Sequence, residues 1–476
     1  MEYKLNVVKD YIGLSDGLTV INPANGEKIA IVKDYSVSET EKHVELANAA
    51  FKTWSVKTAK ERSAVLRKWY ELILENTEAL AHLITIECGK PLFEARGEVA
   101  YAASFIEWFA EEGKRIYGDV IPTHMTDRRI LALKQPIGVI AAITPWNFPL
   151  AMITRKVGPA LAAGCTALVK PAEATPLSAL ALEALAKQAG LPENVMKVIT
   201  TTKPADIGGV FTTHPTIRKI TFTGSTAIGK LLMQQSASTV KKVSMELGGN
   251  APFIVFNDAD IDAAVAGAMV SKYRNAGQTC VCANRFYVHE DVHDEFVEKF
   301  GTAISALKIG NGVDDGVEIG PVINGAAVEK IASLVEASKA DGATVALGGT
   351  RHEAGENYYA PTLITGVTMD MEIANAEIFG PVATIFKFKD EKEVVAMAND
   401  TPFGLACYFY SRDLGRVWRV AEALEYGIVG INEGIISTEV APFGGVKESG
   451  IGREGSKYGI EDYIEIKYCL MGGLNS

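Results

Sequence analysis

The residues best suited to chemistry lie between 272 and 285, where Cys280 and Cys282 are set among glycine, amide and arginine side chains. A glycine three residues before Cys280 lets the backbone turn and present an N–H group beside the sulfur. Arg274 can favour the thiolate, which is the form of cysteine that attacks an electrophilic carbon. A lone cysteine is more often inert packing, so this segment alone predicts a nucleophile without identifying its substrate.

Length and composition describe an ordinary globular chain. Its 476 residues, 48% of them hydrophobic, leave room for about three domains of roughly 150 residues each. A formal net charge of -11 and a pI near 5.3 argue against a nucleic-acid partner. No apolar run approaches ~20 residues and charges interrupt the N-terminal segment, so we expect no membrane association and a cytoplasmic location. Six cysteines are too few for a disulfide framework.

The order of predicted elements indicates an α/β fold. Apolar residues recur at helical spacing over 39–52, 60–76 and 95–115, and we expect these helices to wrap the fold and to carry no chemistry. Short apolar runs then alternate with helical segments. The strands expected from them are 138–143, 166–170, 195–199, 217–223 and 242–247. This alternation predicts a parallel, Rossmann-like sheet that binds a nucleotide at the carboxyl ends of its strands, followed by a second α/β unit from residue 252 onward.

Two short motifs point to other chemistry and are set aside. Residues 224–230 nearly match a triphosphatase phosphate loop, but Leu231 stands where that loop needs Ser or Thr for magnesium. The helix N-terminus there still suits a dinucleotide pyrophosphate. His289 and His293 flank Glu290 as in zinc proteases, but we expect both on a solvated strand-to-helix turn and predict no metal site.

Four segments in chain order resemble the aldehyde dehydrogenase superfamily. They are Thr144-Pro-Trp-Asn-Phe-Pro149, Met245-Glu-Leu-Gly-Gly-Asn250, Asn275-Ala-Gly-Gln-Thr-Cys280 and Ala376-Glu-Ile-Phe-Gly-Pro381. The resemblance covers nearly the whole chain and implies three parts. These are an NAD-binding domain (1–117 and 134–247), a catalytic domain (248–445) and segments that form a small β flap for oligomerisation (118–133 and 446–476). It also implies a homodimer or a homotetramer.

The resemblance assigns catalytic roles that the residue types suit. Cys280 is the nucleophile, and its backbone N–H together with the Asn147 amide would stabilise the negative oxygen of the adduct. Glu246 would activate the water that hydrolyses the thioester, since burial can raise its pKa and the following glycines let it move. The resemblance also implies a role for Lys170, because the matching lysine of the family binds a ribose hydroxyl of the cofactor. We therefore group Lys170 with the catalytic residues. An isolated Asn or Glu at such positions is usually a turn residue or a solvated charge.

The resemblance also implies a set of cofactor-binding residues that lie at strand ends and in loops. It comprises Thr144, Pro145, Trp146, Lys170, Ala172, Glu173, Gly208, Thr223, Gly224, Ser225, Gly229, Leu247, Glu377 and Phe379. Glu173 favours NAD over NADP, because a carboxylate accepts a bond from the ribose 2′-hydroxyl but repels a 2′-phosphate. Glu173 can also be a charge that favours the start of a helix.

Within the superfamily the chain most resembles succinate-semialdehyde dehydrogenases. An ω-carboxylate needs cationic partners, and the matching positions are Arg155 and Arg274, with Ser437 or Thr438 and Phe443 nearby. Either arginine can instead serve a structural ion pair. The alternatives left open are glutarate semialdehyde or another aliphatic aldehyde as substrate, and a catalytically inactive structural relative.

Cys282 lies two residues after the nucleophile and is implied as a possible redox partner of Cys280. A disulfide in so small a ring is strained, and strained accessible disulfides are the regulatory kind. The other interpretation is that Cys282 packs under the loop.

Overall fold

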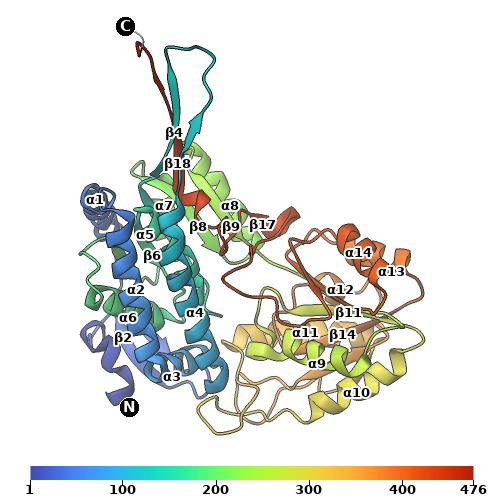
Figure 1. Ribbon diagram of the computed structural model, residues 1–476. Coiled ribbons are helices and arrows are strands. Elements are labelled where there is room, and N and C mark those ends of the chain that lie inside the picture. The colour runs from blue at the N-terminus through green and yellow to red at the C-terminus, as the bar shows by residue number, and fades with distance from the viewer. Residues whose placement is uncertain (1, 475–476) are drawn as a thin grey trace.

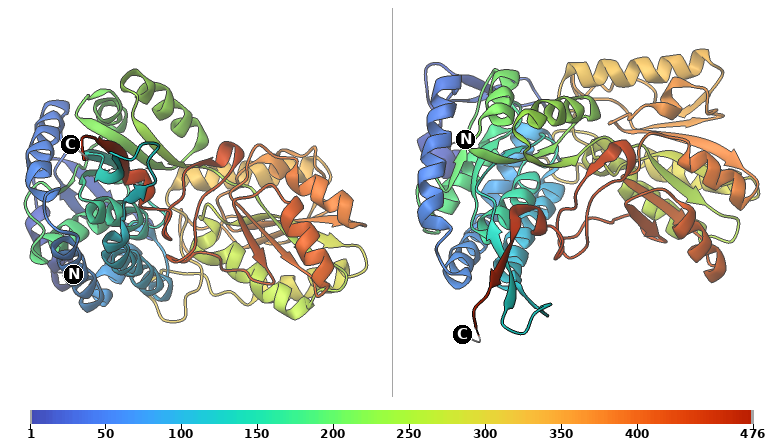
Figure 2. Two further views of the ribbon diagram at one scale, coloured as in Figure 1. Left: turned by 45° about the horizontal axis from the view of Figure 1, so that its top comes forward. Right: turned by 90° about the horizontal axis from the view of Figure 1, so that it is seen from above.

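A computed structural model describes residues 2–474, and for residues 2–4 the backbone only. Two α/β lobes lie side by side, and a narrow β flap projects away from the first lobe (Figures 1 and 2). The predicted α/β fold class is therefore confirmed. No helix within the described range is long and apolar enough to cross a membrane.

The N-terminal quarter is mainly helical and covers the first lobe. Capping boxes start two of its helices, with the Ser36 and Glu39 pair before α1 and the Thr58 and Glu61 pair before α2. Gly89, with φ +87°, ends α3 in the left-handed region. The elements are η1 (Glu2–Tyr11), β1 (Leu18–Ile21), β2 (Lys28–Val32), α1 (Val37–Trp54), α2 (Ala59–Glu75), α3 (Thr77–Cys88), α4 (Leu92–Glu112) and η2 (Gly113–Arg115).

The first lobe contains a six-stranded sheet in the order β17-β9-β8-β5-β6-β7, parallel except for β17. Its strands are β5 (Val139–Ile143), β6 (Thr166–Lys170), β7 (Met196–Val198), β8 (Ile217–Thr223), β9 (Lys242–Glu246) and β17 (Gly450–Ile451). Its helices are α5 (Ala151–Ala163), α6 (Pro176–Gln188), α7 (Pro204–Thr213), α8 (Thr226–Ser236) and the short η3 (Ala237–Thr239). Separate apolar clusters cover the two faces, as all-buried strands require. All five strands predicted for this sheet are present.

The second lobe contains a seven-stranded sheet in the order β12-β13-β14-β11-β10-β15-β16, in which only β12 runs antiparallel. Its strands are β10 (Ala251–Val255), β11 (Ala283–His289), β12 (Thr344–Leu347), β13 (Thr362–Thr365), β14 (Val382–Phe388), β15 (Ala406–Tyr410) and β16 (Ile428–Ile431). Its helices are α9 (Ile261–Tyr273), η4 (Arg274–Gly277), α10 (His293–Ser305), α11 (Gly325–Ala340), α12 (Glu372–Asn375), α13 (Glu391–Asn399) and α14 (Leu414–Ala423).

The flap is a three-stranded antiparallel sheet of β3 (Asp119–Ile121), β4 (Arg129–Pro136) and β18 (Ile464–Met471), in the order β18-β4-β3 (Figure 1). The predicted boundary at residue 446 needs correction, because the tail does not go directly to the flap. It first forms η5 (Lys447–Ser449), β17 and η6 (Glu461–Tyr463), and β17 pairs with β9 of the first lobe. The reason is that Gly450 can approach the β9 backbone as no other residue can, since a Cβ there would lie 1.8 Å from the Met245 oxygen.

Candidate active site

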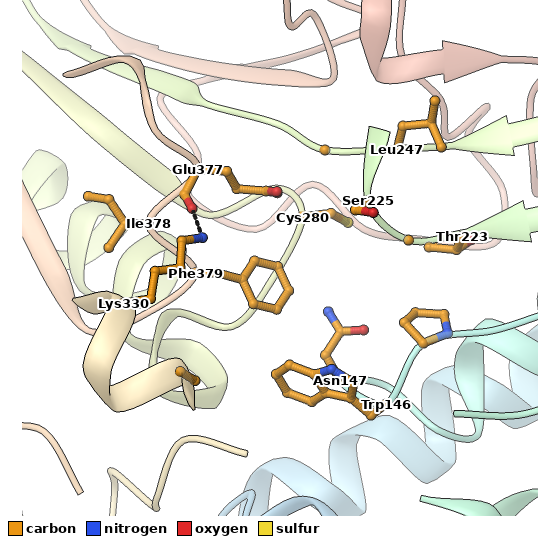
Figure 3. A pocket seen from close by; sticks show the side chains of 14 residues that line it. Trp146, Asn147, Thr223, Ser225, Leu247, Cys280, Lys330, Glu377, Ile378 and Phe379 are labelled. Carbon is orange, nitrogen blue, oxygen red and sulfur yellow. Dashed lines mark hydrogen bonds between the residues drawn. The ribbon is translucent and has the colours of Figure 1, made fainter. Parts of the chain in front are cut away.

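The nucleophile loop follows α9 and is held in a conformation that costs backbone energy. Asn275 and Ala276 both have φ +53°, and Gly277 has φ +75°, so three consecutive residues are left-handed. A Cβ on Gly277 would lie 2.2 Å from the Gly380 carbonyl oxygen, which excludes any other residue. Asn275 is stabilised by its N–H, which donates to Glu94 Oε2 at 2.8 Å. This turn brings Cys280 to a cavity between the lobes (Figure 3).

The cavity places the thiol between groups from both lobes. Trp146 and Asn147 lie on one side of Cys280, and Glu377 and Phe379 on the other (Figure 3). No acceptor in residues 2–474 takes a hydrogen bond from the backbone N–H of Cys280. A Cβ on Gly249 would lie 2.5 Å from the Cys280 carbonyl oxygen, so the segment after β9 packs directly against the nucleophile.

Hydrogen bonds to both the backbone carbonyl and the side-chain amide of Asn147 hold this residue in place. Its carbonyl oxygen accepts from Lys90 Nζ at 2.9 Å and from Asn275 Nδ2 at 3.1 Å. Its side-chain Nδ2 donates to the Gln278 carbonyl at 2.9 Å. An amide nitrogen carries two hydrogens, so one N–H stays available to a negative oxygen near Cys280.

The Lys90 contact depends on a buried ion pair that the sequence analysis did not single out. Lys90 Nζ pairs with Glu98 Oε2, and the two side chains are 1% and 0% exposed. Glu98 Oε1 accepts from the Leu150 N–H at 2.9 Å, at the start of α5. One carboxylate therefore joins α4, α5 and the turn that carries Asn147. The charged residue after Cys88-Gly89 was visible in the sequence, but its partner was not.

Glu246 ends β9 as a buried, partly unsatisfied carboxyl group. Its side chain is 3% exposed as a residue, and Oε2 has no hydrogen-bond partner in the described chain. Burial raises the pKa of Glu246 well above its ordinary value, the neighbouring Glu454 raises it further, and Arg155 opposes both. Such a carboxyl group can accept a proton near neutral pH, where an ordinary glutamate is already ionised and a weak base.

Arg274 favours the thiolate of Cys280, as predicted, but burial of the sulfur outweighs its effect. Burial raises the pKa of the Cys280 thiol to about 12, and Arg155 lowers it more than Arg274 does. Nearby Glu246 and Glu377 also raise this pKa. The thiol is therefore protonated in this state, because removing water from the sulfur outweighs two arginines at a distance.

A narrow second cavity adjoins Cys280 and is lined by four of the five residues predicted to bind the substrate carboxylate. Arg155, Arg274, Ser437 and Phe443 line it. Thr438 does not, because its hydroxyl turns away and donates to Glu439 Oε2 at 3.2 Å, which corrects the prediction to Ser437 alone. Lining residues that the sequence analysis missed are Tyr101, Phe148, Met152, Thr279 and Val281. Tyr101 lies on α4, so one of the N-terminal helices that were expected to carry no chemistry lines this cavity.

The two arginines differ in their partners. Arg155 is 1% exposed, pairs with Glu454 through Nε and lies 4.0 Å from the Phe443 ring centroid. It therefore serves the structural ion pair that was one of its two interpretations, while its Nη2 has no partner among the described residues. Arg274 makes no salt bridge in the described chain and lies over the Phe148 ring at 5.3 Å. Its charge is available to an anion.

The cofactor side of the site is a cavity of about 490 Å³ at the carboxyl ends of β5, β6 and β8. The hydroxyls of Thr144 and Thr223 are buried there and find no hydrogen-bond partner in the described part of the chain, which suits a polar ligand such as a dinucleotide. The predicted residues that line it or the adjoining nucleophile cavity are Thr144, Pro145, Trp146, Lys170, Ala172, Glu173, Gly208, Thr223, Gly224, Ser225, Leu247, Glu377 and Phe379. Ile228, Leu231 and Gln235 of α8 also line it and were missed.

Two predicted cofactor residues have other contacts. Gly229 does not line either cavity but lets α8 pack on Leu247, since a Cβ there would lie 2.3 Å from Leu247 Cδ2. Lys170 Nζ pairs with Glu173 Oε1 and donates to the Pro171 carbonyl at 3.0 Å. The carboxylate of Glu173 is thus present at the cavity, with its charge partly balanced by Lys170.

Cys282 is buried, and its sulfur lies 3.3 Å from Lys272 Nζ. The redox pairing with Cys280 stays a prediction. His293 is 8% exposed, so the expectation that both histidines are solvated is wrong for it, because it lies on the same packed face of α10 as Phe296. The described residues contain no group of three or more His, Cys, Asp or Glu side chains that could hold a metal ion.

A thiol at the junction of two α/β lobes, facing a nucleotide-sized cavity, defines the class of protein. The aldehyde dehydrogenase family profile matches residues 13–469, and the chain belongs to this family. It is 59% identical over 457 residues to the succinate-semialdehyde dehydrogenase [NADP(+)] of Escherichia coli, covering 96% of this chain and 95% of that protein. It is also 59% identical to a glutarate-semialdehyde dehydrogenase of Pseudomonas aeruginosa, covering 96% and 94%. The crystal structure of a succinate-semialdehyde dehydrogenase from Burkholderia pseudomallei superposes with a TM-score of 0.95 at 59% identity, covering 96% and 95%.

We expect Asn275→Gly to lower kcat because it removes the Nδ2 bond to Asn147 while keeping the left-handed backbone. Loss of one buried hydrogen bond, worth about 1–1.5 kcal/mol, should reduce kcat roughly 5- to 13-fold. Steady-state kinetics measure kcat, and cofactor binding followed by fluorescence shows whether the variant still binds the nucleotide, so a loss of catalysis can be told from a loss of binding. Ala276→Gly is the matched control, since it relaxes the same turn without removing a donor. Equal kcat in both variants would show that Asn275 does not position Asn147.

Proposed function

We propose that this protein oxidises succinate semialdehyde to succinate with a nicotinamide dinucleotide. The observation that carries the proposal is the cationic cavity beside Cys280, where Arg274 forms no salt bridge with any residue in 2–474. An aldehyde whose far end bears a carboxylate would supply that partner. The named activities of the relatives support the same choice.

In the proposed mechanism, the thiol of Cys280 gives its proton to solvent water, the sulfur bonds to the aldehyde carbon, and the electron pair of the C=O π bond moves to the oxygen, which becomes negative. The free N–H of Asn147 and the backbone N–H of Cys280 stabilise that oxygen. A nicotinamide cofactor, held by the cavity residues that include Thr223, Ser225 and Glu377, would accept the hydride from the carbon. The product of this step is a thioester on Cys280.

Water must then break the bond between Cys280 and the acyl carbon. Glu246 would take a proton from that water, because its raised pKa makes it a stronger base than an ordinary glutamate. Gly444 leaves space beside the carboxyl group, since a Cβ there would lie 3.0 Å from Glu246 Oε1. Hydroxide adds to the carbonyl, the C–S bond breaks, and the carboxylic acid and the thiol of Cys280 are released.

Glutarate semialdehyde is the second candidate substrate, favoured by the relative of that name. It is one methylene longer, and a pocket discriminates a methylene by only about 1–3 kcal/mol. A panel of succinate semialdehyde, glutarate semialdehyde and butanal, followed by NADH or NADPH absorbance, tests the proposal. A higher kcat/KM for butanal than for both semialdehydes would overturn it.

We also propose that the flap joins subunits in a homodimer or homotetramer and that the enzyme is cytoplasmic. Ile466 and Tyr468 on β18 are 72% and 61% exposed, which is unusual for large apolar side chains and suits an interface. All six cysteines are free, which suits a reducing compartment.

For Glu246→Gln we expect a rapid burst of reduced cofactor followed by very slow turnover, because amide replacement leaves hydride transfer intact but removes the base for hydrolysis. In the parent enzyme the base form of Glu246 increases as pH rises through its raised pKa, so hydrolysis should quicken with pH, and this dependence should vanish in the variant. Stopped-flow absorbance measures both phases, with Cys280→Ala as the control that gives no burst. A parent-like steady-state rate in Glu246→Gln would exclude the role.

Arg274→Ala should raise KM for succinate semialdehyde roughly 10- to 100-fold, because a hydrogen bond to a charged group contributes about 1.5–3 kcal/mol. The KM for butanal, which lacks the carboxylate, should change little. Arg412→Ala is the control, since Arg412 is a surface arginine with a side chain 68% exposed. If both aldehydes lose equally in Arg274→Ala, the arginine maintains the loop and does not bind a carboxylate.

The cofactor preference rests on Glu173, and we propose NAD as the better substrate. Glu173→Ser should raise kcat/KM for NADP about tenfold, because it removes a like charge from the path of the 2′-phosphate and frees Lys170. Activity with NAD should fall, since a hydrogen-bond acceptor for the ribose is lost. Initial rates with each nucleotide measure this, and a parent enzyme that already prefers NADP would contradict the proposal.

A further inference from the structure

Tyr101 of α4 reaches the cavity beside Cys280 with an unsatisfied hydroxyl group. It lines that cavity together with Arg155 and Arg274. Its hydroxyl oxygen is buried and has no hydrogen-bond partner in the described chain. Leaving a buried hydroxyl unpaired normally costs about 1–3 kcal/mol, so proteins rarely keep one without a use.

The tyrosine ring is held so that the hydroxyl stays in the cavity. Its ring packs edge-on against Phe105, one helical turn along α4, with centroids 4.9 Å apart and planes at 68°. A neighbour four residues on the same helix face restricts the ring to this side. The hydroxyl therefore points to the cavity because of packing and not because of a polar contact.

The surroundings of the hydroxyl are cationic. Both Arg155 and Arg274 interact electrostatically with Tyr101, but burial outweighs them and the pKa of Tyr101 is raised. The group is thus a neutral donor at any physiological pH. Glu454 balances the charge of Arg155, which leaves the Arg155 Nη2 group, the charge of Arg274 and the Tyr101 hydroxyl all without acceptors.

We propose that the Tyr101 hydroxyl donates a hydrogen bond to the ω-carboxylate of the substrate and is a specificity-determining residue for acid-terminated aldehydes. A carboxylate has two oxygens with about four acceptor sites, enough for the tyrosine, Arg155 Nη2 and Arg274 together. Uncharged aldehydes would leave the three donors as they are in the free enzyme and would gain none of this binding energy. This inference rests on the proposed function and deepens it.

The test is Tyr101→Phe, which removes one oxygen and keeps the ring and its contact with Phe105. We expect KM for succinate semialdehyde to rise roughly 10- to 100-fold with kcat little changed, and both constants for butanal to stay within about twofold. Succinate, used as an inhibitor of butanal oxidation, should bind more weakly by a similar factor. Ser104→Ala is the matched control, a hydroxyl on the same helix that bonds only the Tyr101 carbonyl at 2.8 Å.

Thermal stability separates a binding role of the hydroxyl from a structural one. If the hydroxyl binds substrate, Tyr101→Phe without ligand should melt at the same temperature as the parent or higher, because an unsatisfied buried group is removed. If the hydroxyl is structural, the variant should melt at a lower temperature. Succinate should then raise the melting temperature of the parent more than that of the variant. A variant that melts several degrees lower, or that loses activity equally on both aldehydes, would overturn the inference. A parent enzyme that does not prefer the semialdehyde would instead contradict the proposed function.

Discussion

The buried ion pair between Lys90 and Glu98 is the interaction on which the geometry of the site depends. With side chains 1% and 0% exposed, neither charge can be left alone, and breaking such a pair costs about 3–5 kcal/mol. Lys90 also donates a hydrogen bond to the Asn147 carbonyl. The second carboxylate oxygen of Glu98 accepts hydrogen bonds from N–H groups at the start of α5. The oxyanion donor and the helix that carries Arg155 are therefore fixed by one pair of charges.

A second constraint acts from the opposite lobe through the backbone. The left-handed turn at Asn275 and Ala276 is costly, and hydrogen bonds with Glu94 and Asn147 compensate for it. These two bonds come from α4 and from the turn after β5, both in the first lobe. The two lobes must therefore be docked before the nucleophile can take its place, which couples domain packing to catalysis.

Much of this arrangement could be predicted from sequence. Alternating apolar runs predict the parallel sheet, and the short segments around Cys280, Asn147 and Glu377 identify groups that the fold gathers at one cavity. Glu246 was also identified, but it is buried behind the lining of this cavity, where its charge interacts with Cys280. Periodicity tells which face of a helix is buried but not which cavity that face lines, so α4 was expected to be a cover and Tyr101 was missed. The partner of Arg155 was also out of reach, since Glu454 lies 299 residues away and only the returning tail brings them together. Ser437 and Thr438 differ by one position, and only the path of the loop decides which faces the cavity.

The returning tail sets an order of events during synthesis. Arg155 and Lys156 are 1% and 0% exposed, and both pair with Glu454, which is synthesised 299 and 298 residues after them. Until then the first lobe holds two adjacent cations that have no carboxylate to balance them, so both side chains must remain solvated by water. The helices and strands of that lobe can form early, because their apolar clusters are largely local to it. Its charged centre can close only after Glu454 has been synthesised, so the substrate cavity matures later than the sheet that supports it.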